Sequence, residues 1–337
     1  MNAGGTRRHT ASRRRRRLRL ELPEGWRVIE TSGPGPFVTR AVLESPDGSA
    51  VEWSSRRHRK LLGLRRPTEP HIGRRERPDR GGGIGRASHM SWAIGSLFAV
   101  GSLCFALGSM PLYFDHVNPT AVAYTFFVGS IFFTSAAYLQ YHEAVAAPTT
   151  PEPAAPPPTG LGRFLGWAPH RIDWWATTIQ LVGTLFFNLS TFSATRADLT
   201  LQHEQRLIWA PDVLGSICFL IASWLACSEV CPRLWCWRDR SLGWWISDLN
   251  LVGSVAFGVS AVAARYLTTT GVPANISLVN LGTFIGAVCF LAGAALLPVE
   301  SAREASPSAT MLNGLEPTHP GPSGGGPGPQ GPDQVIP

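Results

Sequence analysis

A five-residue phrase that begins with glycine and ends with phenylalanine recurs in this 337-residue chain and constrains its fold more than any other feature. One version lies nine residues after a tryptophan in three places, and a second version lies fourteen residues before a glutamate in three places. Spacings kept in three copies define a repeated unit of two helices. The tryptophans are Trp92, Trp174 and Trp244; the first glycines are Gly101, Gly183 and Gly253; the second glycines are Gly129, Gly215 and Gly286; the glutamates are Glu143, Glu229 and Glu300.

The repeats lie in apolar sequence, which predicts that they are embedded in a membrane. Each apolar segment holds close to the ~20 residues that a helix needs to cross the hydrocarbon layer. We therefore expect an all-α membrane protein with six transmembrane helices, arranged as three parallel two-helix repeats. Parallel repeats can surround an axis along the membrane normal, so a pseudo-threefold bundle is one hypothesis. The six segments are approximately 91–112, 120–141, 173–195, 210–228, 244–265 and 275–297.

The distribution of basic residues predicts the orientation. Residues 1–90 carry 21 Lys+Arg and 9 Asp+Glu. If the N-terminus is cytoplasmic, the later connections carry 6 Lys+Arg on the inside and 3 on the outside. Cytoplasmic loops are enriched in Lys and Arg, so both termini are predicted to be cytoplasmic.

The segment before the first span is expected to contain a small basic cytosolic module. Two stretches of β-type composition, 36–44 and 50–53, flank a Ser45-Pro46-Asp47-Gly48 turn, so they predict a β-hairpin. A short basic helix is expected from Ser55. The predicted organisation is 1–19 disordered and Arg-rich, 20–66 the module, 67–89 a linker, 90–143 the first hairpin, 144–162 a Pro-rich linker, 163–230 the second hairpin, 231–243 a cytosolic loop, 244–300 the third hairpin and 301–337 a disordered Gly/Pro tail.

The repeated glycines are interpreted as helix-packing residues, because a residue without Cβ lets a second backbone approach closely. Nine residues of helix span roughly 13–14 Å, so tryptophans at the membrane interface would place the first three glycines near the bilayer centre. Trp92, Trp174 and Trp244 are accordingly predicted to be interfacial anchors. A hinge or a substrate contact at the glycines is the alternative.

Four acidic residues are candidates for a polar or ionisable site: Asp248, Glu143, Glu229 and Glu300. Under pseudo-threefold symmetry the three glutamates would form an acidic ring that attracts cations. The simpler interpretation is three interfacial carboxylates that end the spans, paired with arginines of the N-terminal region. Gln180 and Asn250, which are equivalent in the repeat, are expected to bond between helices.

No enzyme signature is present, and we expect a non-enzymatic protein without a cofactor. Cys227, Cys231 and Cys236 do not have the spacing of common zinc sites, so no metal ligand is predicted. The Arg-rich N-terminus favours the anionic inner leaflet as a partner over nucleic acid, because the chain is tethered to a membrane. A protein partner and a homo-oligomer remain open.

The first hairpin, with Ser91-Trp92-Ala93-Ile94-Gly95-Ser96 and the later Gly129-Ser130-Ile131-Phe132-Phe133, resembles the YrhK-like domain of bacterial membrane proteins over roughly residues 90–143. The later hairpins look like diverged relatives, as in longer actinobacterial members. The resemblance implies a bacterial plasma membrane and a two-span module, and it implies no catalytic or binding residue.

Two functions follow from these observations. The first is a structural or interaction protein whose basic cytosolic region contacts anionic lipid or a protein partner. The alternative is a channel or transporter for a small solute or ion, with a path between the three repeats.

Overall fold

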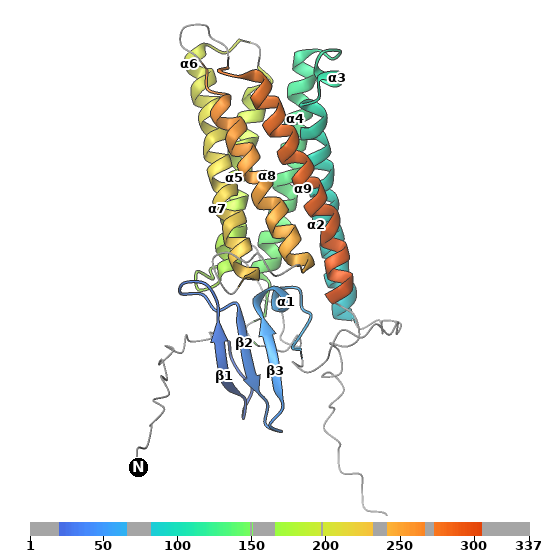
Figure 1. Ribbon diagram of the computed structural model, residues 1–337, viewed down its shortest axis with the longest axis vertical. Helices are drawn as coiled ribbons and strands as arrows, with labels where there is room; N and C mark the ends of the chain where they lie inside the picture. The colour runs from blue at the N-terminus through green and yellow to red at the C-terminus, as the bar shows by residue number, and fades with distance from the viewer. Residues whose placement is uncertain are drawn as a thin grey trace, which may run out of the picture.

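The computed structural model describes residues 20–65, 82–148, 150, 166–196, 198–231, 241–266 and 273–304. It consists of a long helical bundle with a small β-structure at one end (Figure 1). We call residues 20–65 the N-terminal module, and we call the end of the bundle that it contacts the module end. The predicted disordered segment 1–19, residues 305–337 of the predicted tail 301–337, and most of the Pro-rich linker lie outside the described residues.

The N-terminal module contains a three-stranded antiparallel sheet in the order β1-β2-β3. The predicted hairpin is confirmed as β2 (Arg40–Glu44) and β3 (Ala50–Ser54), which are joined by a turn where Gly48 has a φ of 79°. The edge strand β1 (Arg27–Ser32) was not predicted, because its apolar and polar residues do not alternate; half of its residues are exposed. The module has its own small core of Ala41, Leu43, Val51, Trp53 and Leu64.

A short basic helix, α1 (Ser55–Arg59), follows β3 directly and lies between the sheet and the bundle (Figure 1). The Ser54 side chain accepts a hydrogen bond from the backbone N–H of Arg57 and so caps its first turn. The sheet therefore delivers Arg56, Arg57, His58, Arg59 and Lys60 to the module end of the bundle.

Six long helices form the bundle, and each packs against two neighbours. The contacts run from α2 to α4, α5, α7, α8 and α9 and return from α9 to α2, so the six helices close a ring. The ring consists of α2 (Gly82–Gly108), α4 (Pro119–Val145), α5 (Ile172–Ser193), α7 (Ala210–Val230), α8 (Leu242–Ala263) and α9 (Ile276–Glu304).

Short elements connect the helices at the end away from the module (Figure 1). One is α3 (Pro111–Phe114), between α2 and α4. The others are α6 (Leu201–Glu204) and the π-helical turn η2 (Gln205–Trp209), between α5 and α7. The start of α4 has a clear local cause: Asn118 caps the backbone N–H of Thr120, and proline takes the first helical position.

Five helical segments are long and apolar enough to cross a membrane, which makes this a multi-pass membrane protein. They are His89–Gly108, Pro119–Val145, Leu201–Val230, Leu242–Ala263 and Ile276–Glu304. The remaining long helix, α5, falls outside this group although it has 22 residues, and it carries the polar side chains Asp173, Gln180 and Asn188. Five of the six predicted spans are thus supported by length and composition.

Some predicted boundaries differ from the structure. Helix α2 begins at Gly82, inside the segment 67–89 that was predicted to be a linker. Helix α9 continues to Glu304, past the predicted start of the tail at residue 301. The predicted bounds followed the ends of the apolar sequence, and in both cases the helix continues beyond it.

Candidate functional site

The repeated glycines lie where the two helices of each hairpin cross. A Cβ added to Gly101 would lie 2.9 Å from the carbonyl oxygen of Gly129. The corresponding distances are 3.2 Å between Gly183 and Gly215, and 3.1 Å between Gly253 and Gly286. A side chain at these positions would push the helices apart, so the glycines allow a close backbone crossing in all three hairpins.

The phenylalanines that end the repeated phrases come together inside the ring. The six, which we call the phenylalanine layer, are Phe105, Phe133, Phe187, Phe219, Phe257 and Phe290, one from each long helix. Their rings contact across hairpins as well as within them: the centroids of Phe105 and Phe257 are 5.8 Å apart, as are those of Phe133 and Phe290. The space left between them is about 10 Å³, which is room for one water molecule at most. The axis of the ring is therefore closed by apolar side chains.

A polar cavity of about 90 Å³ lies between the phenylalanine layer and the N-terminal module. We call it the polar cavity. Its walls include the amides of Gln140, Gln180 and Asn250 and the hydroxyls of Thr177 and Ser247. Of these amides, Gln180 and Asn250 were expected to bond between helices. Within the described part of the chain, however, no side-chain hydrogen bond joins any of the three to another residue, whereas Asn188 does donate to Thr134 of a neighbouring helix at 2.8 Å. The volume has room for several water molecules.

Basic residues of the module close the polar cavity from the module end. Arg56 donates two hydrogen bonds of 2.8 Å to the carboxylate of Glu300, one from Nε and one from Nη2. The Nζ of Lys60 lies 2.7 Å from Glu300 and 3.3 Å from Glu304. Only 4% of the Lys60 side chain is exposed, so this lysine, the one lysine of the sequence, is held inside the interface.

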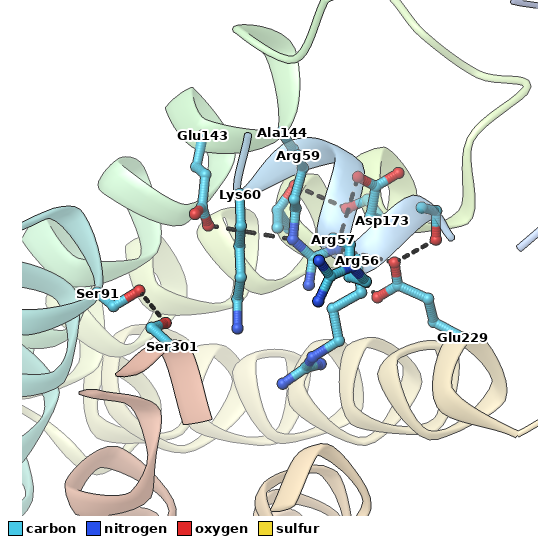
Figure 2. Close-up of polar contacts among 12 residues, drawn as sticks. Arg56, Arg57, Arg59, Lys60, Ser91, Glu143, Ala144, Asp173, Glu229 and Ser301 are labelled. Carbon is cyan, nitrogen blue, oxygen red and sulfur yellow. Dashed lines mark hydrogen bonds and ion pairs between the residues drawn. The ribbon is translucent and has the colours of Figure 1, made fainter. Parts of the chain in front are cut away.

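Arg59 makes a second set of ion pairs (Figure 2). Its Nη1 donates at 3.0 Å to both oxygens of Glu229, which also accepts a 2.6 Å hydrogen bond from Ser55. The same nitrogen lies 3.5 Å from the fully buried Asp173. The other partner of Asp173 is Arg171, the residue directly before α5. A buried carboxylate without such partners would cost several kcal/mol, so these contacts are required for the carboxylates to stay charged.

Glu143 is the least well paired of the repeat glutamates. Its one ion pair is a 4.0 Å contact with Nε of Arg59, and it accepts no hydrogen bond within the described residues. About 13% of its side chain is exposed, and it faces the polar cavity. The three equivalent glutamates are thus brought to one end of the ring but are satisfied unequally.

The electrostatics of the module residues agree with this geometry. Burial works against the charged form of Arg59, but attraction to Glu229, Asp173 and Glu143 outweighs burial and raises the pKa of the guanidinium. The same holds for Arg56. Burial opposes its charged form, but attraction to Glu300 is stronger and raises its pKa. Among the described residues, His58 forms no ion pair with a carboxylate. Burial lowers the pKa of its imidazole to about 4, although its Nε2 lies 2.8 Å from the carbonyl oxygen of Pro148.

The remaining predicted residues do not join this site. Asp248 is half-buried on α8 and is absent from the walls of the polar cavity. The three repeat tryptophans differ in surroundings: Trp92 is 60% exposed, whereas Trp174 is 4% exposed and donates a 2.8 Å hydrogen bond to the carbonyl of Gly166. Trp244 is half-buried and stacks edge-on against Trp245. In the described part of the chain, no group of His, Cys, Asp and Glu side chains is arranged to hold a metal ion.

The sequence suggested N-terminal arginines as partners of the glutamates, and Arg56 and Arg59 are such partners of Glu300 and Glu229, but it did not single out Arg56, Arg59 and Lys60. The signal was present, because a basic helix follows the predicted hairpin and the repeat glutamates need counter-charges. What the sequence lacked was any indication that this helix lies across the end of the bundle.

Comparison of the chain with models of known families, with characterised proteins and with solved structures finds no match. The resemblance of residues 90–143 to the YrhK-like domain therefore stays a prediction.

Proposed function

We propose that this is a non-enzymatic protein of a bacterial plasma membrane, in which six helices span the bilayer and hold the N-terminal module at the cytoplasmic face. The ring arrangement supports α5 as the sixth span, because α5 packs between α4 and α7 as one of six equal members. Both α2 and α9 have an end at the module end, where the Lys+Arg-rich N-terminal sequence enters (Figure 1). That distribution favours a cytoplasmic module.

The observation that carries the docking role is the buried ionic interface between α1 and the bundle. Three carboxylates from three different helices, Asp173, Glu229 and Glu300, each contact a module cation at 3.5 Å or less. Removing one partner of such a pair leaves an uncompensated buried charge, which costs about 3–5 kcal/mol. Arg56, Arg59 and Lys60 are therefore engaged inside the protein. Lipid contact is left to basic residues elsewhere, and the Arg-rich segment 1–19 is our candidate for the anionic leaflet.

A linker-cleavage experiment tests the docking role. A protease site inserted within residues 66–81 allows the module to be cut from the bundle after the full chain has been purified in detergent. We expect the module to co-purify with the wild-type bundle and to be lost from the Glu229→Gln/Glu300→Gln variant. Asp248→Asn is the matched control, because it removes a carboxylate of α8 that does not face the interface. Loss of the module from the wild type at low salt would overturn the proposal.

A conduit between the repeats is the second candidate, and the polar cavity inside a closed ring favours it. In the described state the path is blocked twice, by the phenylalanine layer and by α1. Substituting Phe133 and Phe257 with alanine would remove the apolar barrier in part. If the protein is a conduit, proteoliposomes with this variant should show faster flux of small ions than wild type, and equal flux would argue against a conduit.

A further inference from the structure

The polar cavity raises the question of what it can bind, since α1 fills only part of it. The carboxylates around it come from equivalent places in three repeats, but α1 is a single helix and satisfies them unequally. Glu300 has two cationic partners and Glu229 has Arg59 and Ser55, whereas Glu143 has one contact at 4.0 Å. The walls nearest Glu143 therefore keep hydrogen-bonding capacity that α1 does not use.

The chemical groups of α1 show which ligand chemistry the carboxylates accept. A guanidinium forms a two-bond pair with Glu300, a second guanidinium bridges both oxygens of Glu229, and an ammonium also lies on Glu300. Planar guanidinium groups match carboxylates in this way because their N–H donors are fixed in a fork. Beyond these pairs, the amide side chains of Gln140, Gln180 and Asn250 line the polar cavity, and an amide oxygen can accept N–H groups.

The contact between α1 and the bundle is polar. The apolar core of the module and the apolar core of the bundle are distinct clusters that share no residue. The bonds that join them at α1 are ion pairs and hydrogen bonds. Ion pairs exchange with competing ions, whereas a continuous apolar core would not.

The carboxylates around the polar cavity determine which class of ligand it can bind. Without Arg56, Arg59 and Lys60, the cavity wall would keep Glu143, Asp173 and Glu229, with Glu300 beside it, and among the described residues Arg171 would be their remaining ionic partner. Buried carboxylates need a replacement cation. We propose that the polar cavity is a binding site for small organic cations that carry a guanidinium or primary ammonium group, and that α1 occupies it as a built-in competitor. This inference rests on the proposed docking of the module.

Ligand-dependent thermal unfolding of a full-length variant tests the site. In Arg56→Gln/Arg59→Gln/Lys60→Gln the competing cations are gone, so butylguanidinium should raise Tm by about 2–4 °C, the shift of about one kcal/mol of stabilisation for a chain of this size class. Butylurea has nearly the same shape without the charge and should leave Tm unchanged. In the wild type, where α1 occupies the site, the shift should be smaller than in the triple variant.

Adding Glu229→Gln and Glu300→Gln to the triple variant should abolish the shift. Equal shifts with butylguanidinium and butylurea, or a shift that survives these two substitutions, would overturn the proposal. Should the triple variant fail to fold, the linker-cut wild type decides the question: butylguanidinium should release the module and butylurea should not. Module release by both compounds or by neither would also count against the site. A failure of docking alone would appear as loss of the module before any compound is added.

Discussion

The phenylalanine layer and the polar cavity are neighbouring sections of one ring, yet they depend on different partners. The layer repeats the same side chain six times and is complete within the helices, with centroid distances of 5.0 to 6.3 Å between its members. The cavity is lined at repeat positions where the residue type differs between copies. One such position holds Phe98, Gln180 and Asn250 in the three repeats. Glu229 in the cavity wall and Glu300 beside it have their ionic partners in the N-terminal module. A repeat can therefore specify the packing of a bundle while leaving one end to be completed by a different part of the chain.

Among substitutions that distinguish the polar cavity from the phenylalanine layer, Glu300→Ala should have the largest effect. It leaves Arg56 and Lys60 buried without their main partner, so docking of the module should weaken by about 3–5 kcal/mol. Hydrogen exchange at the amides of α1 should rise strongly, while exchange in the middle of α4 and α9 stays slow. Equally raised exchange in those helices would mean that the two sections are not independent.

Phe133→Ala should destabilise the bundle and leave the docking of the module intact. Phe133 contacts the rings of Phe98, Phe105 and Phe290, and its truncation leaves a cavity that should lower bundle stability by about 2–4 kcal/mol. The module should still co-purify after linker cleavage. Val128→Ala, on the exposed side of the same helix, is the control and should change the unfolding midpoint little.

Gly253→Ala tests how much the close crossing of two helices contributes to the stability of the bundle. Its Cβ would lie 3.1 Å from the carbonyl oxygen of Gly286 and from Cβ of Cys289, so the crossing of α8 and α9 must shift, at about 1–3 kcal/mol. Gly258→Ala on the same helix has its nearest neighbour at 3.5 Å and should be tolerated. Thermal unfolding of both variants compares the positions directly, and similar midpoints would contradict a special role for the repeat glycine.

The smallest effect is the pH dependence of docking. Burial lowers the pKa of His58 to about 4 from 6.5, so the docked state resists a proton that the released state takes up. Docking should be insensitive to this group above pH 6.5 and should weaken as the pH falls from 6.5 toward 4, by about 1–2 kcal/mol at pH 5. His58→Gln can keep the hydrogen bond to Pro148 and should remove this component. Identical pH profiles for wild type and His58→Gln would show that His58 does not contribute.

The sequence by itself determined the repeated unit, the apolar spans and their closely packed glycines, because these depend on local spacing and on the fit of small and aromatic side chains within one hairpin. It also predicted the β2–β3 hairpin, whose turn is encoded by Pro46 and Gly48. Only the tertiary structure decided that the hairpins close a ring, that Gln180 and Asn250 face a cavity, and that Arg56, Arg59 and Lys60 meet Glu229 and Glu300. The partners in these ion pairs are 170 to 244 residues apart. No local pattern records such a pairing, because its energy depends on burial and on the position of a module that lies far from its partners in the sequence.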